Sequence, residues 1–314
     1  MRKLLLVLTV ASLVIVGGLA GYADARYTIG VTIYSYNHPY TLRVLAGVNA
    51  AAEKYGCDVV AIDSQDDQNK QIADTEALIA RGVDAIVATP ITTEGGQAVV
   101  DLANEAGVPI ICVSRTVPSG KYAYIGSNDV DAGRMAVRYF AEQLGGSGKV
   151  AMVQGTMGSS SEIDRTAGWD EEIVNYPGLE EVMRLTGGFF RDGGNKATED
   201  ILTAYPDVEA IWYQNDAMLV GGVVALEEAG MNDQVITLGV DGDPETIAYI
   251  KDARANATLY QEAELQGGLA VGLAVAAIQG RDLLGYETKF SWVDSSNVFE
   301  IFPDESNEIK DYPY

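Results

Sequence analysis

The chain has 314 residues and a formal net charge of −24, from 45 acidic and 21 basic side chains. This charge argues against a nucleic-acid-binding protein, because contact with phosphates requires basic patches. Its one histidine, His38, leaves no means of building a Ser-His-Asp triad elsewhere or a His/Cys metal cluster. We therefore expect no metal, no other cofactor and no enzymatic activity. The length is enough for two domains.

The first 25 residues have the pattern of a cleavable export signal. Arg2 and Lys3 precede an apolar run over residues 4–16, and Ala23-Asp24-Ala25 forms an Ala-x-Ala cleavage site. The alternative is a retained membrane anchor, but the run is shorter than the ~20 residues that a membrane-spanning helix needs. We expect cleavage before Arg26 and a soluble protein in the periplasm.

Short apolar runs alternate with helical patterns through the rest of the chain. Strands are predicted at residues 28–34, 58–63, 85–88, 109–113, 122–125, 149–154, 181–186, 210–213, 235–239 and 257–260. Helices are predicted at residues 39–55, 68–81, 94–106, 131–144, 166–176, 197–204, 217–229, 244–252 and 264–279. This rhythm predicts two similar α/β lobes, each a doubly wound parallel sheet with helices on both faces. No Pro/Ser-rich linker separates them, so short crossings should join the lobes and allow hinge closure.

Cys57 and Cys112 are the only cysteines, and both border or lie in predicted strands. After export they could form a disulfide. The simpler interpretation is that both are small buried apolar residues.

Three polar residues each follow an apolar run in the second half of the chain. They are Asn215, Asp241 and Gln261. Ligands of open α/β sheets bind at the carboxyl ends of the strands, so these three side chains should outline a pocket.

Several short motifs occur together in this chain. They include Tyr34-Ser-Tyr-Asn-His-Pro-Tyr40, Gly82-Val-Asp-Ala-Ile, Ile125-Gly-Ser-Asn-Asp, Arg165-Thr-Ala-Gly-Trp, Gln214-Asn-Asp, Gly239-Val-Asp-Gly and Ala257-Thr-Leu-Tyr-Gln. With the export signal and the two-lobe pattern, they resemble the type I periplasmic sugar-binding proteins, above all the ribose-binding subfamily of ABC-transporter receptors. The resemblance extends from Tyr27 to about Phe299.

The resemblance implies a first lobe of residues 26–127 and 262–293 and a second lobe of residues 128–261 and 294–314, joined by three crossings. It also implies a function. A small sugar, either a pentose, a hexose or a polyol, would bind between the lobes of a monomer and be delivered to a membrane permease that an ATPase drives.

The resemblance also implies the site residues. Positions that match the family's pattern are Tyr40, Arg115, Arg165, Phe189, Asn215, Asp241 and Gln261. Arg and Asp can make charge-assisted hydrogen bonds to sugar hydroxyls, and aromatic rings can cover the sugar's C–H faces. Six positions depart from the family's pattern. Tyr34 stands where the family usually has a smaller polar residue, and His38 and Thr89 stand where it usually has Asn. Thr41 and Val240 replace aromatic residues, and Ser114 replaces an Asp.

Each of these residues also has a structural alternative. Arg115 and Arg165 could pair with carboxylates across the lobes. Asn215 and Asp241 could cap the helices that follow them. Phe189 could be a core residue, and His38 a loop residue without contact to the ligand.

Three functional alternatives stay open. The loss of a carboxylate at Ser114 leaves two arginines against Asp241, which could favour a sugar acid or another small anion. The same fold could present its ligand to a chemoreceptor or sensor kinase without transport. An enzyme is the third alternative, and turnover of a bound sugar would be its sign.

Overall fold

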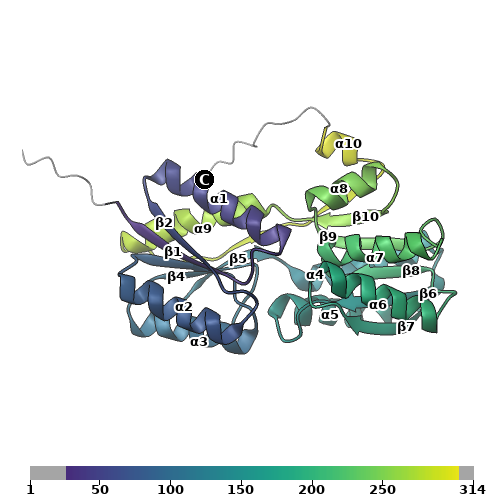
Figure 1. Cartoon of the computed structure of the whole chain (residues 1–314), viewed down its shortest axis with the longest axis horizontal. Helices are drawn as coiled ribbons and strands as arrows, with labels where there is room; N and C mark the ends of the chain where they lie inside the picture. The colour runs from purple at the N-terminus through teal and green to yellow at the C-terminus, as the bar shows by residue number, and fades with distance from the viewer. Residues whose placement is uncertain (1–25, 304–314) are drawn as a thin grey trace, which may run out of the picture.

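The computed structural model describes residues 26–303, which form two α/β lobes side by side (Figure 1). The expected export signal and the tail after residue 303 lie outside the described residues. Each lobe contains a six-stranded sheet, one strand more than the five that the sequence pattern predicts for each lobe. Within the described part of the chain, no helix combines the length and apolar character needed to cross a membrane.

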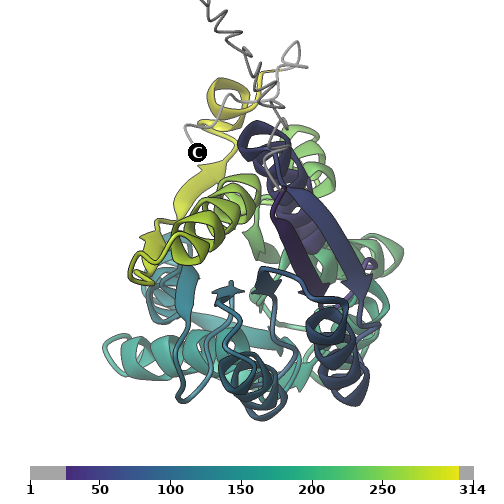
Figure 2. The same cartoon turned by 90° about the vertical axis from the view of Figure 1, so that its left-hand side faces the viewer.

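The first lobe has a sheet in the order β11-β5-β4-β3-β1-β2, and all of its strand pairs are parallel. Its strands are β1 (Thr28–Ile33), β2 (Asp58–Asp63), β3 (Ala85–Ala88), β4 (Ile110–Val113), β5 (Ala123–Ser127) and β11 (Tyr286–Thr288). Its helices are α1 (Pro39–Tyr55), α2 (Gln68–Arg81), α3 (Thr93–Glu105) and α9 (Ala263–Ile278). Helices α1 and α9 lie side by side on one face, and α2 and α3 cover the other (Figure 2).

The second lobe repeats this plan with the order β12-β10-β9-β8-β6-β7. Its strands are β6 (Ser147–Gln154), β7 (Gly178–Thr186), β8 (Ala210–Tyr213), β9 (Ile236–Asp241), β10 (Ala257–Tyr260) and β12 (Ser291–Asp294). Its helices are α4 (Asp129–Gln143), α5 (Ser160–Ile173), α6 (Arg191–Ala204), α7 (Asp216–Glu228), α8 (Pro244–Lys251) and α10 (Val298–Ile301). Strand β12 is antiparallel to its neighbour β10.

Local signals in the sequence fix where helices begin and end. The Asp67 carboxylate accepts a hydrogen bond from the Asn69 backbone N–H at 2.8 Å and so caps the start of α2. Gly82 ends the helix at φ 78°, a left-handed conformation that favours glycine. Glycine also sets the spacing of α1 and α9. A Cβ atom on Gly47 would lie 1.9 Å from the Glu264 carbonyl oxygen, so the two helices approach backbone to backbone.

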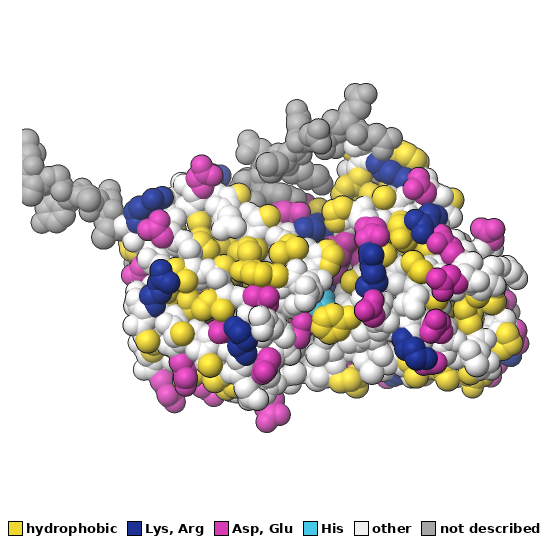
Figure 3. Space-filling model, viewed as in Figure 1, with side chains coloured by type: hydrophobic (Ala, Val, Ile, Leu, Met, Phe, Trp, Pro, Cys, Tyr) yellow, Lys and Arg dark blue, Asp and Glu magenta, His cyan; other side chains and the backbone are white. Residues whose placement is uncertain are grey.

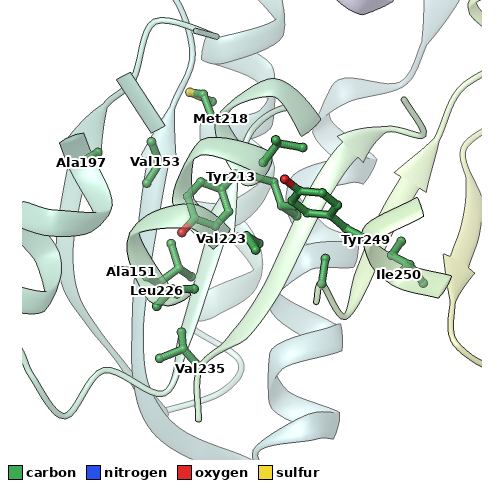
Figure 4. Packing of buried hydrophobic residues seen from close by; sticks show 14 of the residues in the cluster. Ala151, Val153, Ala197, Tyr213, Met218, Val223, Leu226, Val235, Tyr249 and Ile250 are labelled. Atoms are coloured by element: carbon green, nitrogen blue, oxygen red, sulfur yellow. The ribbon is translucent and has the colours of Figure 1, made fainter. Parts of the chain in front are cut away.

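Apolar side chains fill both faces of the second sheet. On one face, Tyr213 and Leu226 pack with other fully buried residues of α7 and β8 (Figure 4). On the other, the rings of Trp169 and Trp212 stack with centroids 5.3 Å apart. Burial of side chains of this size contributes about 1.5–3 kcal/mol each, so the two faces hold the lobe together.

Cys57 and Cys112 are free and buried, as the simpler interpretation of the sequence predicted.

The expected strands and helices are all present, but several start earlier than expected. Helix α5 begins at Ser160 rather than at residue 166, because the Ser159 hydroxyl caps it by accepting a hydrogen bond from the Glu162 N–H.

The chain passes between the lobes three times. The crossings lie between β5 and α4, between β10 and α9, and between β11 and β12. The third requires a correction, because we expected residues 291–293 in the first lobe. They lie in β12 of the second sheet, where Val293 is fully buried opposite Thr258.

The acidic composition is visible on the surface. Asp and Glu side chains are scattered over both lobes, with Lys and Arg between them (Figure 3). No segregated basic surface is seen on this face.

Candidate binding site between the lobes

A small cavity lies where the two lobes meet. Both lobes contribute lining residues, and so does the crossing between β10 and α9. The lining residues are Tyr34, Tyr40, Ser114, Arg115, Ser161, Arg165, Phe189, Asn215, Asp241 and Gln261. Each of these residues is at most 8% exposed. The lining is therefore buried, and nine of the ten lining residues are among those expected from the sequence.

Direct hydrogen bonds between the lobes keep the cavity closed. The Thr116 N–H donates to the Ser160 hydroxyl at 2.8 Å, and the Thr93 N–H donates to the Gly158 carbonyl at 2.9 Å. The Ser161 hydroxyl donates to the Ser114 carbonyl at 3.3 Å. These contacts join the start of α5 and the loop before it to the segment after β4 and to the start of α3 in the first lobe.

The two arginines of the cavity are each held within their own lobe. Arg165 Nε donates to the Asp129 carboxylate at 2.8 Å, and both side chains are buried. Arg115 Nη1 donates to the carbonyls of Pro90 and Ile91, each at 2.9 Å, and burial lowers its pKa. The alternative that these arginines pair with carboxylates across the lobes is therefore wrong.

The three strand-end residues differ in their roles. The Asn215 side chain caps α7, since its oxygen accepts from the Met218 N–H at 3.0 Å, and it also lines the cavity. Asp241 caps no helix, because the cap position of α8 is Asp243. One Asp241 carboxylate oxygen accepts from Gln261 Nε2 at 2.7 Å. Burial, and then the charge of Asp243, raise the pKa of Asp241.

Among the aromatic lining residues, Tyr40 comes from the first lobe and Phe189 from the second. The Tyr40 hydroxyl donates to Gln266 of α9, which fixes the ring. Phe189 has φ 69°, an unusual conformation for a residue with a side chain, and its ring fits only because residue 155 is glycine. Phe189 also belongs to the hydrophobic core, so this residue both packs in the core and lines the cavity.

A family model for the periplasmic binding protein domain matches residues 29–282. The chain belongs to the type I periplasmic sugar-binding proteins. It is 32% identical over 257 residues to the ribose import binding protein of Bacillus subtilis, covering 82% of this chain and 83% of that protein.

Two further relatives in this family are similar over most of their length. The xylitol-binding protein of Mycolicibacterium smegmatis is 30% identical over 271 residues, 85% of this chain and 76% of that protein. An ABC transporter solute binding protein from Bacillus halodurans, solved with bound myo-inositol, is 31% identical with a TM-score of 0.83, covering 88% and 97% of the two chains.

Four residues expected at the site from the family's pattern do not line the cavity. Thr89 and Thr41 hold the backbone: the Thr89 hydroxyl accepts from the Tyr34 N–H at 3.0 Å, and the Thr41 hydroxyl donates to the Ser35 carbonyl at 2.5 Å. Val240 points into the core of the second lobe. His38 is 1% exposed and packs between the rings of Tyr34 and Phe190.

Sequence reasoning missed Ser161 and Asp129. Ser161 belongs to the first turn of α5, in a Ser-Ser-Ser-Glu run that is a capping signal we did not use. Asp129 lies within the motif Ile125-Gly-Ser-Asn-Asp, but its pairing with Arg165 joins helices α4 and α5 and has no local signature.

Proposed function

We propose that this protein is the solute receptor of an ABC importer and that it binds a neutral pentose, hexose or polyol between its lobes. The observation that carries the proposal is the combination of two arginines, one carboxylate and three aromatic side chains around one cavity. Sugar hydroxyls both donate and accept hydrogen bonds, so guanidinium and carboxylate groups can bind adjacent hydroxyls, while the rings cover the C–H faces.

The charge balance supports a neutral ligand. Arg165 is paired with Asp129, and the remaining charges of the cavity are Arg115 and Asp241. One positive and one negative group leave the lining close to neutral when both are ionised. The three relatives described above are named for ribose or xylitol, or hold myo-inositol, and all three compounds are neutral and carry several hydroxyls.

Closure is the step that links binding to delivery. Arg115 and Tyr40 come from the first lobe, and Arg165, Asn215 and Asp241 come from the second. Only the closed arrangement lets a ligand contact all of them at once, so the ligand stabilises that arrangement. The closed receptor would then dock on a permease in the membrane. Export to the periplasm rests on the sequence pattern of residues 1–25.

A thermal-shift panel of D-ribose, D-xylose, L-arabinose, D-glucose, D-galactose, D-allose, xylitol and myo-inositol tests the binding function. A ligand that binds only the native state stabilises it. A ligand concentration of 100 times the Kd adds about 2.7 kcal/mol to the free energy of unfolding. We expect at least one member to raise the melting temperature. A folded sample that responds to none would overturn the sugar proposal.

A sugar acid is the second candidate, favoured by one observation. Arg115 has hydrogen bonds to carbonyls but, among the described residues, no ion pair with a carboxylate. A carboxylate on the ligand could take that place. Adding D-ribonate and D-gluconate to the panel separates the two candidates.

Deleting the gene separates import from signalling. If the protein serves an importer, growth on its sugar as sole carbon source should be lost at low sugar concentration. If it only presents the ligand to a sensor, growth should persist while the sugar response is lost.

A further inference from the structure

Tyr34 is held rigidly at the edge of the cavity. It directly follows β1, and its N–H donates to Thr89. The Arg115 guanidinium lies 4.1 Å from the centre of the Tyr34 ring, and the His38 ring packs edge-on with its centroid at 4.7 Å. His38 in turn contacts the Phe190 ring of the second lobe, also at 4.7 Å. The Tyr34 ring is thus enclosed on several sides and cannot swing out in the closed form.

The second lobe also contacts this stack beside the cavity. Phe189 lies 5.3 Å from the Arg115 guanidinium carbon, while the adjacent Phe190 contacts His38. The first-lobe stack of Arg115, Tyr34 and His38 therefore lies between two consecutive phenylalanines of the second lobe. Closure of the lobes tightens the Tyr34 position.

The Tyr34 hydroxyl is available to a ligand. The residue is 5% exposed and lines the cavity, and its hydroxyl makes no hydrogen bond with any of the described residues. Burial raises the pKa of Tyr34 strongly, so the hydroxyl stays neutral and can donate. This hydroxyl can therefore donate a hydrogen bond to a polar group of a ligand in the cavity.

The ring also occupies space. With the Tyr34 ring in place, the closed cavity has only about 10 Å³ of free volume, roughly the space that one water molecule needs. Tyr34 follows β1 and lines the cavity, so its ring takes up space on the first-lobe side. The rigid stack prevents the ring from yielding to a larger ligand.

We propose that Tyr34 is the residue that sets ligand size, and that it selects a five-carbon sugar over the hexose that carries one more hydroxymethyl group. This proposal rests on the proposed function. In it, the ring excludes the extra hydroxymethyl group and the hydroxyl donates to the sugar.

Three pairs of pyranoses differ only by that group: D-ribose and D-allose, D-xylose and D-glucose, and L-arabinose and D-galactose. Isothermal titration of the full mature chain with all six measures the preference. We expect the preferred stereochemical series to favour the pentose by about tenfold or more. Tyr34→Ser should reduce or reverse this ratio, Tyr34→Phe should weaken both sugars while keeping the ratio, and the exposed-site control Tyr36→Ser should change neither.

The outcomes distinguish this proposal from the function on which it rests. If wild-type protein binds none of the six sugars and no polyol, the proposed function fails. If sugars bind but the pentose-to-hexose ratio is the same in wild type and Tyr34→Ser, the size-selecting role of Tyr34 is overturned. If Tyr34→Ser does not fold, Tyr34→Leu keeps an apolar contact with Arg115 and His38, and the same change in ratio is expected from it.

Discussion

Arg43 of the first lobe reaches Asp243 of the second, with Nη1 3.3 Å from the carboxylate oxygen Oδ1. The same nitrogen donates to the carbonyls of Asp241 and Gly242, at 3.3 and 3.1 Å. Arg43 Nε is fixed by Glu264 of α9 at 2.9 Å. The Arg43 side chain therefore joins helix α1 to the loop that ends β9, next to the carboxylate of the cavity.

Replacing Arg43, which does not itself line the cavity, should weaken ligand binding. Hydrogen bonds to charged groups contribute about 1.5–3 kcal/mol, and those to the second lobe form only when the lobes are together. We expect Arg43→Met to lower sugar affinity about tenfold by calorimetry, while Arg81→Met, at the exposed end of α2, serves as a control. Equal affinity in both variants would show that the Arg43 contact does not support closure.

The buried carboxylates Asp216, Asp241 and Asp243 should make stability fall as pH rises. Burial, and then the charge of Asp241, raise the pKa of Asp216 above its ordinary value. Between these two pKa values the native protein holds a proton that the unfolded chain has released. The stabilisation from the protonated carboxyl is therefore complete below about pH 4 and is gradually lost as the pH rises to about 7.

Asp216→Asn removes one of these ionisations. Between pH 4.5 and pH 7.5 its free energy of unfolding, relative to wild type, should rise on the order of 1–3 kcal/mol. Urea denaturation at several pH values measures this slope, and the exposed Asp252→Asn is the control. A difference from wild type that stays constant with pH would contradict the assignment.

Breaking the Arg165–Asp129 pair should change the charge preference of the site. Asp129→Asn leaves Arg165 buried without its carboxylate, which costs about 3–5 kcal/mol of stability. At a temperature where the variant is folded, D-ribonate should gain at least about tenfold over D-ribose relative to wild type. An unchanged ratio would mean that Asp129 does not set the charge of the cavity.

Gly155 should be required for Phe189 to reach the cavity. A Cβ atom at residue 155 would lie 1.9 Å from Phe189 Cζ, so Gly155→Ala must displace the ring. We expect about tenfold weaker sugar binding and a stability loss of about 1–3 kcal/mol from overpacking. Gly272→Ala, where the nearest neighbour is the Tyr55 hydroxyl at 3.3 Å, is the matched control. Wild-type affinity in Gly155→Ala would exclude a role for Phe189 in binding.

Much of the fold could be predicted because buried parallel strands are continuous apolar runs. Residues 28–33, for example, are almost entirely buried in the structure. The strands β11 and β12 were missed, since they have three and four residues, lie at sheet edges and are partly exposed. Short edge strands have little apolar patterning, and their pairing depends on the rest of the lobe.

The site could be predicted in part. Asn215, Asp241 and Gln261 were found because each follows a strand, and strand ends meet at one edge of the sheet. The sequence does not reveal that the side chains of Thr41 and Thr89 point away from the cavity. Their hydroxyls make hydrogen bonds with backbone groups instead. The pairing of Arg165 with Asp129 depends on the packing of two helices, which residue spacing does not reveal.

Calorimetric titration of the mature protein with the neutral sugars and polyols, repeated with Asp241→Asn, tests sugar binding in the cavity. We expect at least one compound to bind with 1:1 stoichiometry. We also expect Asp241→Asn to lower that affinity at least about tenfold, because a charged hydrogen bond to the ligand is weakened. Binding of none of these compounds to folded protein, or an affinity that Asp241→Asn and Arg165→Met both leave unchanged, would contradict sugar binding in the cavity.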